Sequence, residues 1–314
     1  MRLFFATDIH GYERCFMKFV NAAKAYRADC VVMGGDITGK LLVPVVREPD
    51  GSTTADVFGV TRTVHSDDEV AELRKTLRQA GSYTVDLTRQ EKDDLDRAPE
   101  RVPAVFAQAI AETLQRWFEV ARERLEPAGI PIFVSPGNDD EAYVDPVFAA
   151  ARYVVCPEGR IVELPGGYEM VSCGFANKTP FDSHRELEED ELEARVTGIA
   201  EHLREPSRAI FNLHCPPHNT SLDSAPLLDA ELRAVVRGGT MVMAPAGSVA
   251  TRRVIERFQP LLGLHGHIHE SRGVQKLRST TCINPGSEYS EGVLRGALVE
   301  LDGAKLKGWQ LTVG

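Results

Sequence analysis

Five short segments of the chain carry side chains that can bind a metal ion. They supply two carboxylates, four imidazoles and one amide: Asp8, His10, Asp36, Asn138, His214, His267 and His269. This set of hard and borderline ligands lacks a thiolate and suits Mn, Fe, Zn or similar ions. Seven ligands are too many for one tetrahedral ion. They fit two divalent ions that share a bridging carboxylate.

Two such ions would favour phosphate chemistry. They carry four positive charges, of which Asp8, Asp36 and a bridging hydroxide cancel three, so the site stays positive and attracts phosphate. Paired metal ions also lower the pKa of bound water and stabilise the charge of an in-line displacement. The residues therefore favour a phosphoric ester hydrolase that acts on phosphate mono- or diesters through a hydroxide bridging two divalent metals.

Each candidate ligand segment follows an apolar run with the length of a buried strand. These runs cover residues 3–7, 30–33, 130–134, 209–213 and 261–264. Helical patterns lie between several of them, the clearest within 101–126, and this alternation predicts an α/β fold. Ligands bind at the carboxyl ends of strands in open α/β sheets, so the five segments predict one shared site.

The rest of the chain is predicted to complete a single domain over residues 1–314. Residues from about 40 to 100 are rich in charge and turn formers, with capping boxes that start at Ser66 and Thr88. We interpret them as an insertion of loops and short helices, either a solvated decoration or a lid or dimer contact beside the site. Segments 281–284, 294–301 and 308–313 predict strands of a sheet that closes the fold.

The composition indicates which binding partners and which cellular compartment to expect. The formal net charge is -10 and no block of Lys and Arg occurs. This disfavours a long nucleic acid, which is bound mainly by neutralising its phosphates. No apolar run has the length of a signal-peptide core or a membrane span, and the six cysteines form no C-x-x-C pair. We expect a cytoplasmic protein with a small phosphorylated substrate and no membrane partner, and a homo-oligomer stays open.

The five segments resemble, in order, the motifs of the calcineurin-like metallophosphoesterases. The matching motifs are D-x-H (Asp8, His10), G-D (Asp36), G-N-x (Asn138), a lone histidine (His214) and G-H-x-H (His267, His269). The resemblance implies a four-layer αββα sandwich with a dinuclear site at the strand ends. It also implies the ligands: Asp8, His10 and His269 for the first metal, Asn138, His214 and His267 for the second, and Asp36 as the bridge.

One motif departs from the family pattern. Much of the family has a histidine after the asparagine, and the resemblance gives that histidine the roles of orienting the phosphate and protonating the leaving group. This chain has Asp139 there. An ionised Asp139 would repel phosphate, whereas a protonated one could act as the acid; we expect the ionised form, because a carboxyl near two cations gains more from charge than it loses to burial. His218, in a turn-rich loop four residues after His214, is the best candidate for a substitute acid.

Alternative functions remain open at this point. Within the enzyme class, the chain could be a nucleotide or cyclic-nucleotide phosphodiesterase, a general phosphatase or a small nuclease, and the acidic composition disfavours the nuclease. From another class, it could be a non-catalytic scaffold on the same fold. The presence of all seven ligand residues argues against a scaffold, because a buried polar cluster is costly unless it is used.

Overall fold

The computed structural model describes all of residues 1–314, and its first sheet contains the amino-terminal strand. The order is β21-β20-β1-β2-β7, in which β1, β2 and β7 are parallel and β20 is antiparallel to β1. Their bounds are Arg2–Ala6 (β1), Cys30–Met33 (β2), Ile132–Val134 (β7), Arg295–Asp302 (β20) and Lys305–Val313 (β21).

A second sheet of six strands has the order β18-β19-β17-β12-β9-β8. Its four central strands are parallel to one another, so their carboxyl ends meet at one edge, whereas the outer strands β18 and β8 are antiparallel to them. The bounds are Ile161–Leu164 (β8), Tyr168–Cys173 (β9), Ile210–Leu213 (β12), Leu262–Leu264 (β17), Gly273–Leu277 (β18) and Thr280–Asn284 (β19). The five strands predicted before the candidate ligands are thus confirmed. The three predicted carboxyl-terminal strands also form, but they divide between the two sheets.

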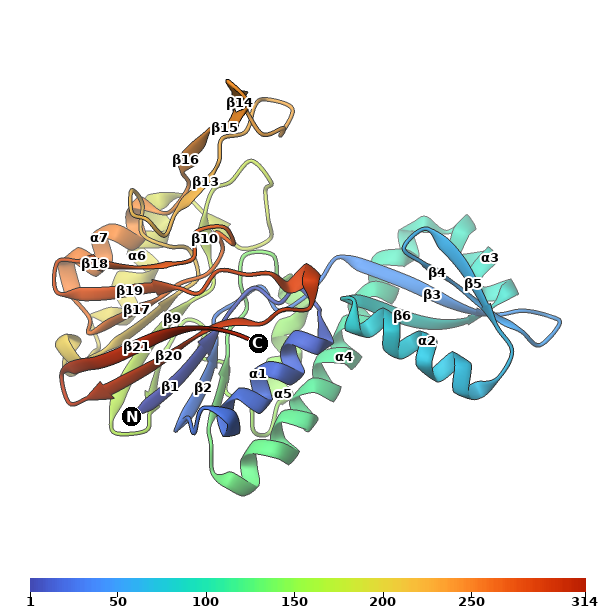
Figure 1. The fold of residues 1–314 in the computed structure, drawn as a ribbon, viewed down its shortest axis with the longest axis horizontal. Helices are drawn as coiled ribbons and strands as arrows, with labels where there is room; N and C mark the ends of the chain where they lie inside the picture. Colours follow the sequence, from blue (N-terminus) through green and yellow to red (C-terminus); the bar gives the residue numbers. More distant parts are fainter.

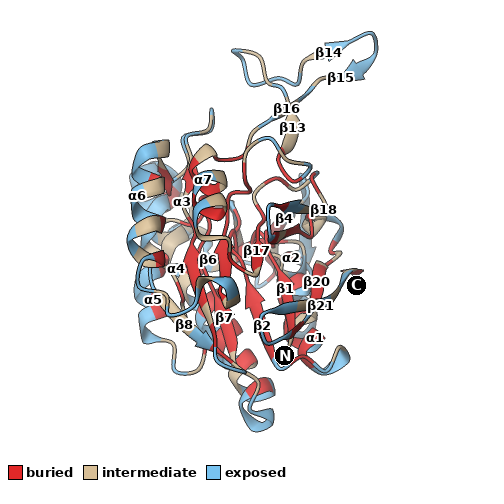
Figure 2. Cartoon of the chain, turned by 90° about the vertical axis from the view of Figure 1, so that its left-hand side faces the viewer, coloured by how far each residue is buried: buried red, intermediate tan, exposed pale blue.

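Helices pack on both sheets. The first sheet is covered by α1 (Glu13–Ala25), α4 (Val102–Leu125) and α5 (Asp145–Ala150), and the second by α6 (Glu189–Ala200) and α7 (Val249–Phe258). Figure 2 shows the buried strands between these helices. The helix predicted within 101–126 is confirmed as α4, and its Trp117 stacks on Phe16 of α1 with ring centroids 4.7 Å apart.

Three hydrophobic cores follow from the alternation of side chains along the strands. Phe4 of β1 points into the core between the first sheet and its helices, whereas Phe5 points into the core between the two sheets. The third core lies between the second sheet and α6 and α7. Burial of each such phenylalanine contributes about 1.5–3 kcal/mol. These cores fix the strand ends that carry the site.

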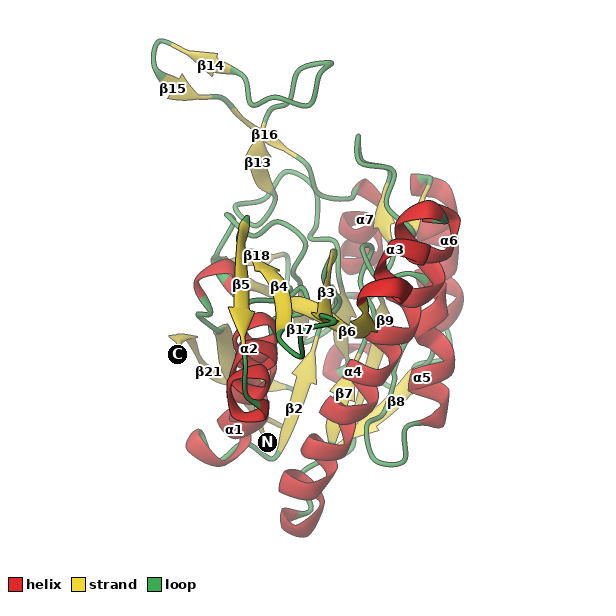
Figure 3. Cartoon of the chain, turned by 90° about the vertical axis from the view of Figure 1, so that its right-hand side faces the viewer, coloured by secondary structure: helices red, strands yellow, loops and turns green.

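Residues 41–97 form a separate lobe beside the first sheet (Figure 1), and this lobe faces the viewer in Figure 3. The lobe has a four-stranded sheet, β5-β4-β3-β6, and a small core of its own that includes Val43, Val45 and Leu77. Its elements are β3 (Leu41–Arg47), β4 (Thr53–Val57), β5 (Val60–Val64), α2 (Asp67–Gln79), β6 (Ser82–Thr88) and α3 (Arg89–Arg97).

The lobe corrects one prediction. Both capping boxes form, at Ser66 and Thr88, but the expected loops are four strands. Pro44 made the first of these strands hard to recognise in the sequence, because proline cannot donate to a sheet ladder and is typical of edge strands. β3 tolerates it because β4 pairs only with Val46 and Arg47, which leaves Pro44 with a partner on one side alone.

An arm formed by residues 224–245 extends from the edge at which the strands of the second sheet end (Figure 1). It consists of β13 (Ser224–Pro226), β14 (Val236–Arg237), β15 (Thr240–Met241) and β16 (Met243–Pro245). Near its base, β10 (Ala176–Asn177) pairs with β11 (Glu186–Leu187). Short 3-10 turns occur at Pro99–Arg101, Glu126–Ala128, Ala142–Val144, Pro206–Arg208 and Tyr289–Glu291. None of the helices combines the length and apolarity needed to cross a membrane.

Candidate metal centre

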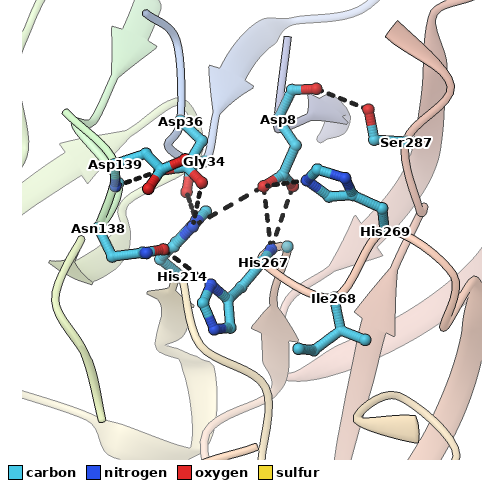
Figure 4. Close-up of polar contacts among 12 residues, drawn as sticks. Asp8, Gly34, Asp36, Asn138, Asp139, His214, His267, Ile268, His269 and Ser287 are labelled. Atoms are coloured by element: carbon cyan, nitrogen blue, oxygen red, sulfur yellow. Dashed lines mark hydrogen bonds and ion pairs between the residues drawn. The ribbon is translucent and has the colours of Figure 1, made fainter. Parts of the chain in front are cut away.

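The strand ends of the two sheets bring the predicted ligands together; those other than His10 are labelled in Figure 4. Asp8 follows β1 and Asp36 follows β2, its parallel neighbour; Asn138 follows β7, which lies next to β2. The histidines His214, His267 and His269 come from the second sheet, after β12 and β17. The two sheets are joined directly, since the backbone N–H of His267 donates to the carboxylate of Asp8 at 3.1 Å.

Six of the seven residues form two compact clusters. The first cluster contains Asp8, His10 and His269, and the second contains Asp36, His214 and His267; within each cluster the ligand atoms lie within 4.8 Å of one another. In the first, His269 Nε2 lies 3.2 Å from His10 Nε2 and 3.4 Å from Asp8 Oδ1.

The seventh residue, Asn138, contacts the second cluster, and the second cluster is linked to the first. Asn138 Oδ1 lies 2.7 Å from His267 Nδ1. Oδ2 of Asp36 is 3.3 Å from His214 Nε2 and 3.8 Å from His10 Nε2, a residue of the first cluster. One carboxylate oxygen of Asp36 therefore faces both clusters, which is the geometry that a bridging ligand needs.

The buried negative charge of the two clusters favours a bound cation. Asp8 and Asp36 are both buried. Burial alone would raise the pKa of Asp36, but the nearby imidazoles of His214 and His10 hold it well below its usual range. Burial likewise disfavours a charged His214, yet Asp36 and Asp8 outweigh it and raise its pKa to about 10. A buried carboxylate pair thus demands positive charge, which a metal ion supplies as well as a proton does.

The fold orients the ring of His214 and keeps His267 neutral. The Nδ1–H of His214 donates to the carbonyl of Gly34 at 3.0 Å, which directs Nε2 into the site. That Nε2 is buried and has no hydrogen-bond partner. Burial and the charge of His214 lower the pKa of His267 to about 4. A fixed tautomer and a free ring nitrogen are typical of metal-binding histidines, so these residues fit a metal ion.

The backbone at the ligands is strained. Asp8, His10, Asp36 and His267 have positive φ values of 53°, 41°, 48° and 65°. Residues other than glycine rarely adopt this left-handed region, at a cost of about 1–3 kcal/mol each, and such residues gather at functional sites. Four strained residues within one set of seven indicate that the fold holds these side chains for a function.

Two motif glycines allow the backbone to approach the carboxylates. A Cβ on Gly137 would lie 2.2 Å from Asp36 Oδ1, and a Cβ on Gly266 would lie 2.3 Å from Asp8 Oδ2. Both contacts are shorter than real Cβ atoms tolerate. The glycines of the G-N-x and G-H-x-H motifs are therefore required by close packing against the two aspartates.

The loops that carry Asp36 and Asn138 are tied together by Asp140, a residue that the sequence analysis did not single out. Its Oδ2 accepts hydrogen bonds from the N–H groups of Ile37 and Gly137, at 3.1 and 2.7 Å. Its Oδ1 accepts from the N–H and the hydroxyl of Thr38. Burial and the charge of Asp36 raise the pKa of Asp140 to about 6.

Replacing Asp140 by asparagine is expected to lower the free energy of unfolding by about 1–3 kcal/mol, the cost of unsatisfied buried donors. In the wild type, each carboxylate oxygen of Asp140 accepts from two donors. In either orientation of the new amide, its NH₂ group therefore faces two donors that have lost their acceptor. Urea unfolding measures the loss. The exposed Asp302→Asn is the matched control and should change stability by less than about 0.5 kcal/mol. Equal stability of the two variants would contradict this positioning role.

The loop after β19 supports the G-H-x-H turn. The side-chain amide of Asn284 donates to the carbonyls of Gly266 and Ile268 at 3.2 and 2.9 Å. The hydroxyl of Ser287 donates to the backbone carbonyl of Asp8 at 2.6 Å (Figure 4). The only sequence signal for these roles was the stretch Asn284-Pro285-Gly286-Ser287, which follows the G-H-x-H motif along the chain.

Asp139 lies beside the first cluster, and its carboxylate is held by two donors. Oδ2 is 2.7 Å from the Lys40 ammonium and 3.9 Å from His10 Nδ1, and Oδ1 accepts from the Ser183 hydroxyl at 3.0 Å. The backbone N–H of Asp139 donates to Asp36 at 2.9 Å. The structure thus places Asp139 at the site and pairs it with a cation from the base of the lobe.

His218 lies farther along the same face. Its Nδ1 is 3.2 Å from the carbonyl of Gly247 and 3.7 Å from Asp223 Oδ2. Its ring lines a cavity together with His267 and His269. The contacts of His218 Nδ1 are therefore with residues outside the two clusters, although His218 lines the same cavity as His267 and His269.

Comparisons with known proteins begin with the sequence. No family model matches the chain. The uncharacterized protein MJ1162 of Methanocaldococcus jannaschii is 32% identical over 119 residues, which are 37% of this chain and 47% of that protein. The match therefore spans about half of that relative's length.

Solved structures cover the whole chain at low identity. TT1561 of Thermus thermophilus has a TM-score of 0.55 at 15% identity and covers 100% of this chain and 97% of its own. A further crystal structure has a TM-score of 0.58 at 14% identity, covering 100% and 98%. These similarities show a shared mixed α/β fold.

Proposed function

We propose that the chain is a metal-dependent hydrolase of phosphate mono- or diesters. The observation that carries this proposal is the pair of largely buried clusters, in which Asp36 of the second also faces His10 of the first. The proposed ligands are Asp8, His10 and His269 for one ion, Asn138, His214 and His267 for the other, and Asp36 for both. Helices on the outer face of each sheet support the αββα sandwich of calcineurin-like metallophosphoesterases.

Two divalent ions, when bound, lower the pKa of water and stabilise the charge that develops during phosphoryl transfer. The chain's own residues prepare the site for them. Asp8 and Asp36 provide buried negative charge, and the carbonyl of Gly34 orients His214. Rigid strand ends and the bonds to Asp140 and Asn284 fix the ligand loops. Positioning of this kind is what lets a charged site act without reorganising during the reaction.

Protein purified without chelators is expected to hydrolyse an activated aryl phosphate, to lose that activity on exhaustive chelation, and to regain it with Mn²⁺. The rate should rise with pH through about 7, where water bound to such ions ionises. Elemental analysis before and after chelation measures the metal that accompanies the activity.

Two outcomes would contradict the proposal in different ways. Activity that survives confirmed metal removal would refute a metal-dependent reaction. Metal-replete protein that hydrolyses no monoester, diester or cyclic nucleotide would favour the alternative of a non-catalytic scaffold on the same fold. The exposed His202→Ala provides a control for surface effects of histidine replacement and should behave like the wild type.

A further inference from the structure

A cavity of 710 Å³ opens beside the two clusters. It lies between residues 177–181, the base of the arm and the G-H-x-H turn, and Figure 1 shows the loop after β10 rising beside the arm. His269 of the first cluster and His267 of the second both line it. A phosphate at the proposed metal centre would therefore direct the organic part of its ester into this cavity.

The wall of the cavity presents apolar groups to solvent. Phe181 of the loop and Leu227 of the arm both line it and are 63% and 37% exposed. Hydrogen bonds order the loop that carries Phe181. The N–H of Thr179 donates to Glu186 at 2.9 Å, and the Thr179 hydroxyl accepts from the N–H of Phe181 at 3.2 Å. Exposed apolar groups on ordered walls of a concave site are typical of ligand binding.

The charges on the wall disfavour a second phosphate. Its only lysine is Lys178, which pairs with Asp182 at 3.4 Å. Glu270 and Glu189 contribute negative charge, and Glu189 is occupied by the N–H groups at the start of α7. The group that fills the cavity is therefore not anionic.

Polar groups among the apolar ones also disfavour an aliphatic chain. Asn177 and His218 line the same cavity and offer hydrogen-bonding groups. A planar heteroaromatic ring fits this mixture, because its face packs on Phe181 and Leu227 while its edge has donors and acceptors. Aromatic side chains stack on the face of a nucleobase whatever its identity.

We propose that this cavity binds the base of a nucleoside-type phosphate ester, and that Phe181 and Leu227 determine this specificity. The proposal rests on the proposed function for the position of the phosphate. It assigns the substrate class through the cavity alone: one phosphate at the metal centre, and an uncharged aromatic heterocycle between loop and arm.

Calorimetric titration tests the proposal with two non-hydrolysable probes, the 5′-phosphonate analogues of AMP and of ribose 5-phosphate, on metal-loaded protein. The AMP analogue is expected to bind about tenfold more tightly, the contribution of one stacked base. Phe181→Ala should remove about that factor for the AMP analogue and leave the ribose analogue unchanged. Leu227→Ala should act in the same direction. Phe58→Ala, which removes another exposed phenylalanine, on the lobe, is the control and should change neither.

The outcomes separate this proposal from the proposed function. Equal binding of both probes, or an unchanged preference in Phe181→Ala and Leu227→Ala, would overturn the base site, even if aryl phosphate hydrolysis is intact. A preference that Phe181→Ala removes, in protein that turns over no ester, would support the base site and overturn the hydrolase. Because Phe181 is exposed, its replacement leaves the cores of the fold untouched.

Discussion

Asp36→Asn is expected to empty both halves of the proposed metal centre and to lower aryl phosphate hydrolysis by about 10³-fold. Oδ2 of Asp36 faces His214 of one cluster and His10 of the other, so its charge serves both ions. Loss of about 4 kcal/mol of metal-dependent charge stabilisation corresponds to that factor in rate. The asparagine keeps an oxygen for the N–H of Asp139, which holds the local fold.

The comparison with His214→Ala makes the test specific. His214 belongs to the second cluster only, so its removal should lower the content of chiefly one ion. Elemental analysis of both variants and of the His202→Ala control gives the number of ions per chain. Full occupancy in Asp36→Asn would disprove a bridging role for Asp36.

Asp139→His is expected to speed the hydrolysis of alkyl esters by about 10²-fold and that of aryl esters much less. General acids contribute about 10²–10⁴-fold, mostly where the leaving group needs a proton. In the structure the Asp139 carboxylate accepts from Lys40 and Ser183, so it is occupied as an acceptor. Wild-type rates should therefore fall steeply as the pKa of the leaving group rises, and an imidazole at this position should flatten that dependence.

Leaving-group slopes for the wild type, Asp139→His and Asp139→Asn decide between the roles. If Asp139→Asn slows alkyl esters specifically, Asp139 itself is the acid and the expectation is wrong. Equal slopes in all three proteins would show that Asp139 takes no part in protonation. Asp302→Asn, which removes an exposed carboxylate at the end of β20, is the control for the change in charge and should keep the wild-type slope.

The gathering of the candidate ligands could be predicted from the sequence because its signal is local. Each ligand follows a short apolar strand and sits next to a glycine or in a turn, and the parallel pairing of those strands brings the ends together without further information. Asp8 and Asp36 illustrate this, since β1 and β2 are neighbours in register from Leu3 and Cys30 onward. The resemblance to known motifs added the division of the ligands between two ions.

The supporting residues could not be predicted because they act across long stretches of chain. Asp140 serves Ile37 and Thr38, about a hundred residues earlier, and Lys40 reaches Asp139 from the base of the lobe. Their side chains are ordinary turn and surface types whose partners depend on the tertiary path. The strands of the lobe were missed for a related reason, because the pairing of β3 with β6 protects a segment that Pro44 made look irregular.

The chain distance between the ligands has a consequence for how the protein is made. His10 and His269 lie 3.2 Å apart in space but 259 positions apart in sequence. The second cluster needs His267 and the first needs His269, so neither exists on a ribosome-bound chain until both the first and the last third of the sequence are present. β1 likewise gains its neighbour β20 only after synthesis passes Arg295. Contacts of such long range form late and slowly, so a partly synthesised chain does not yet have a complete set of ligands.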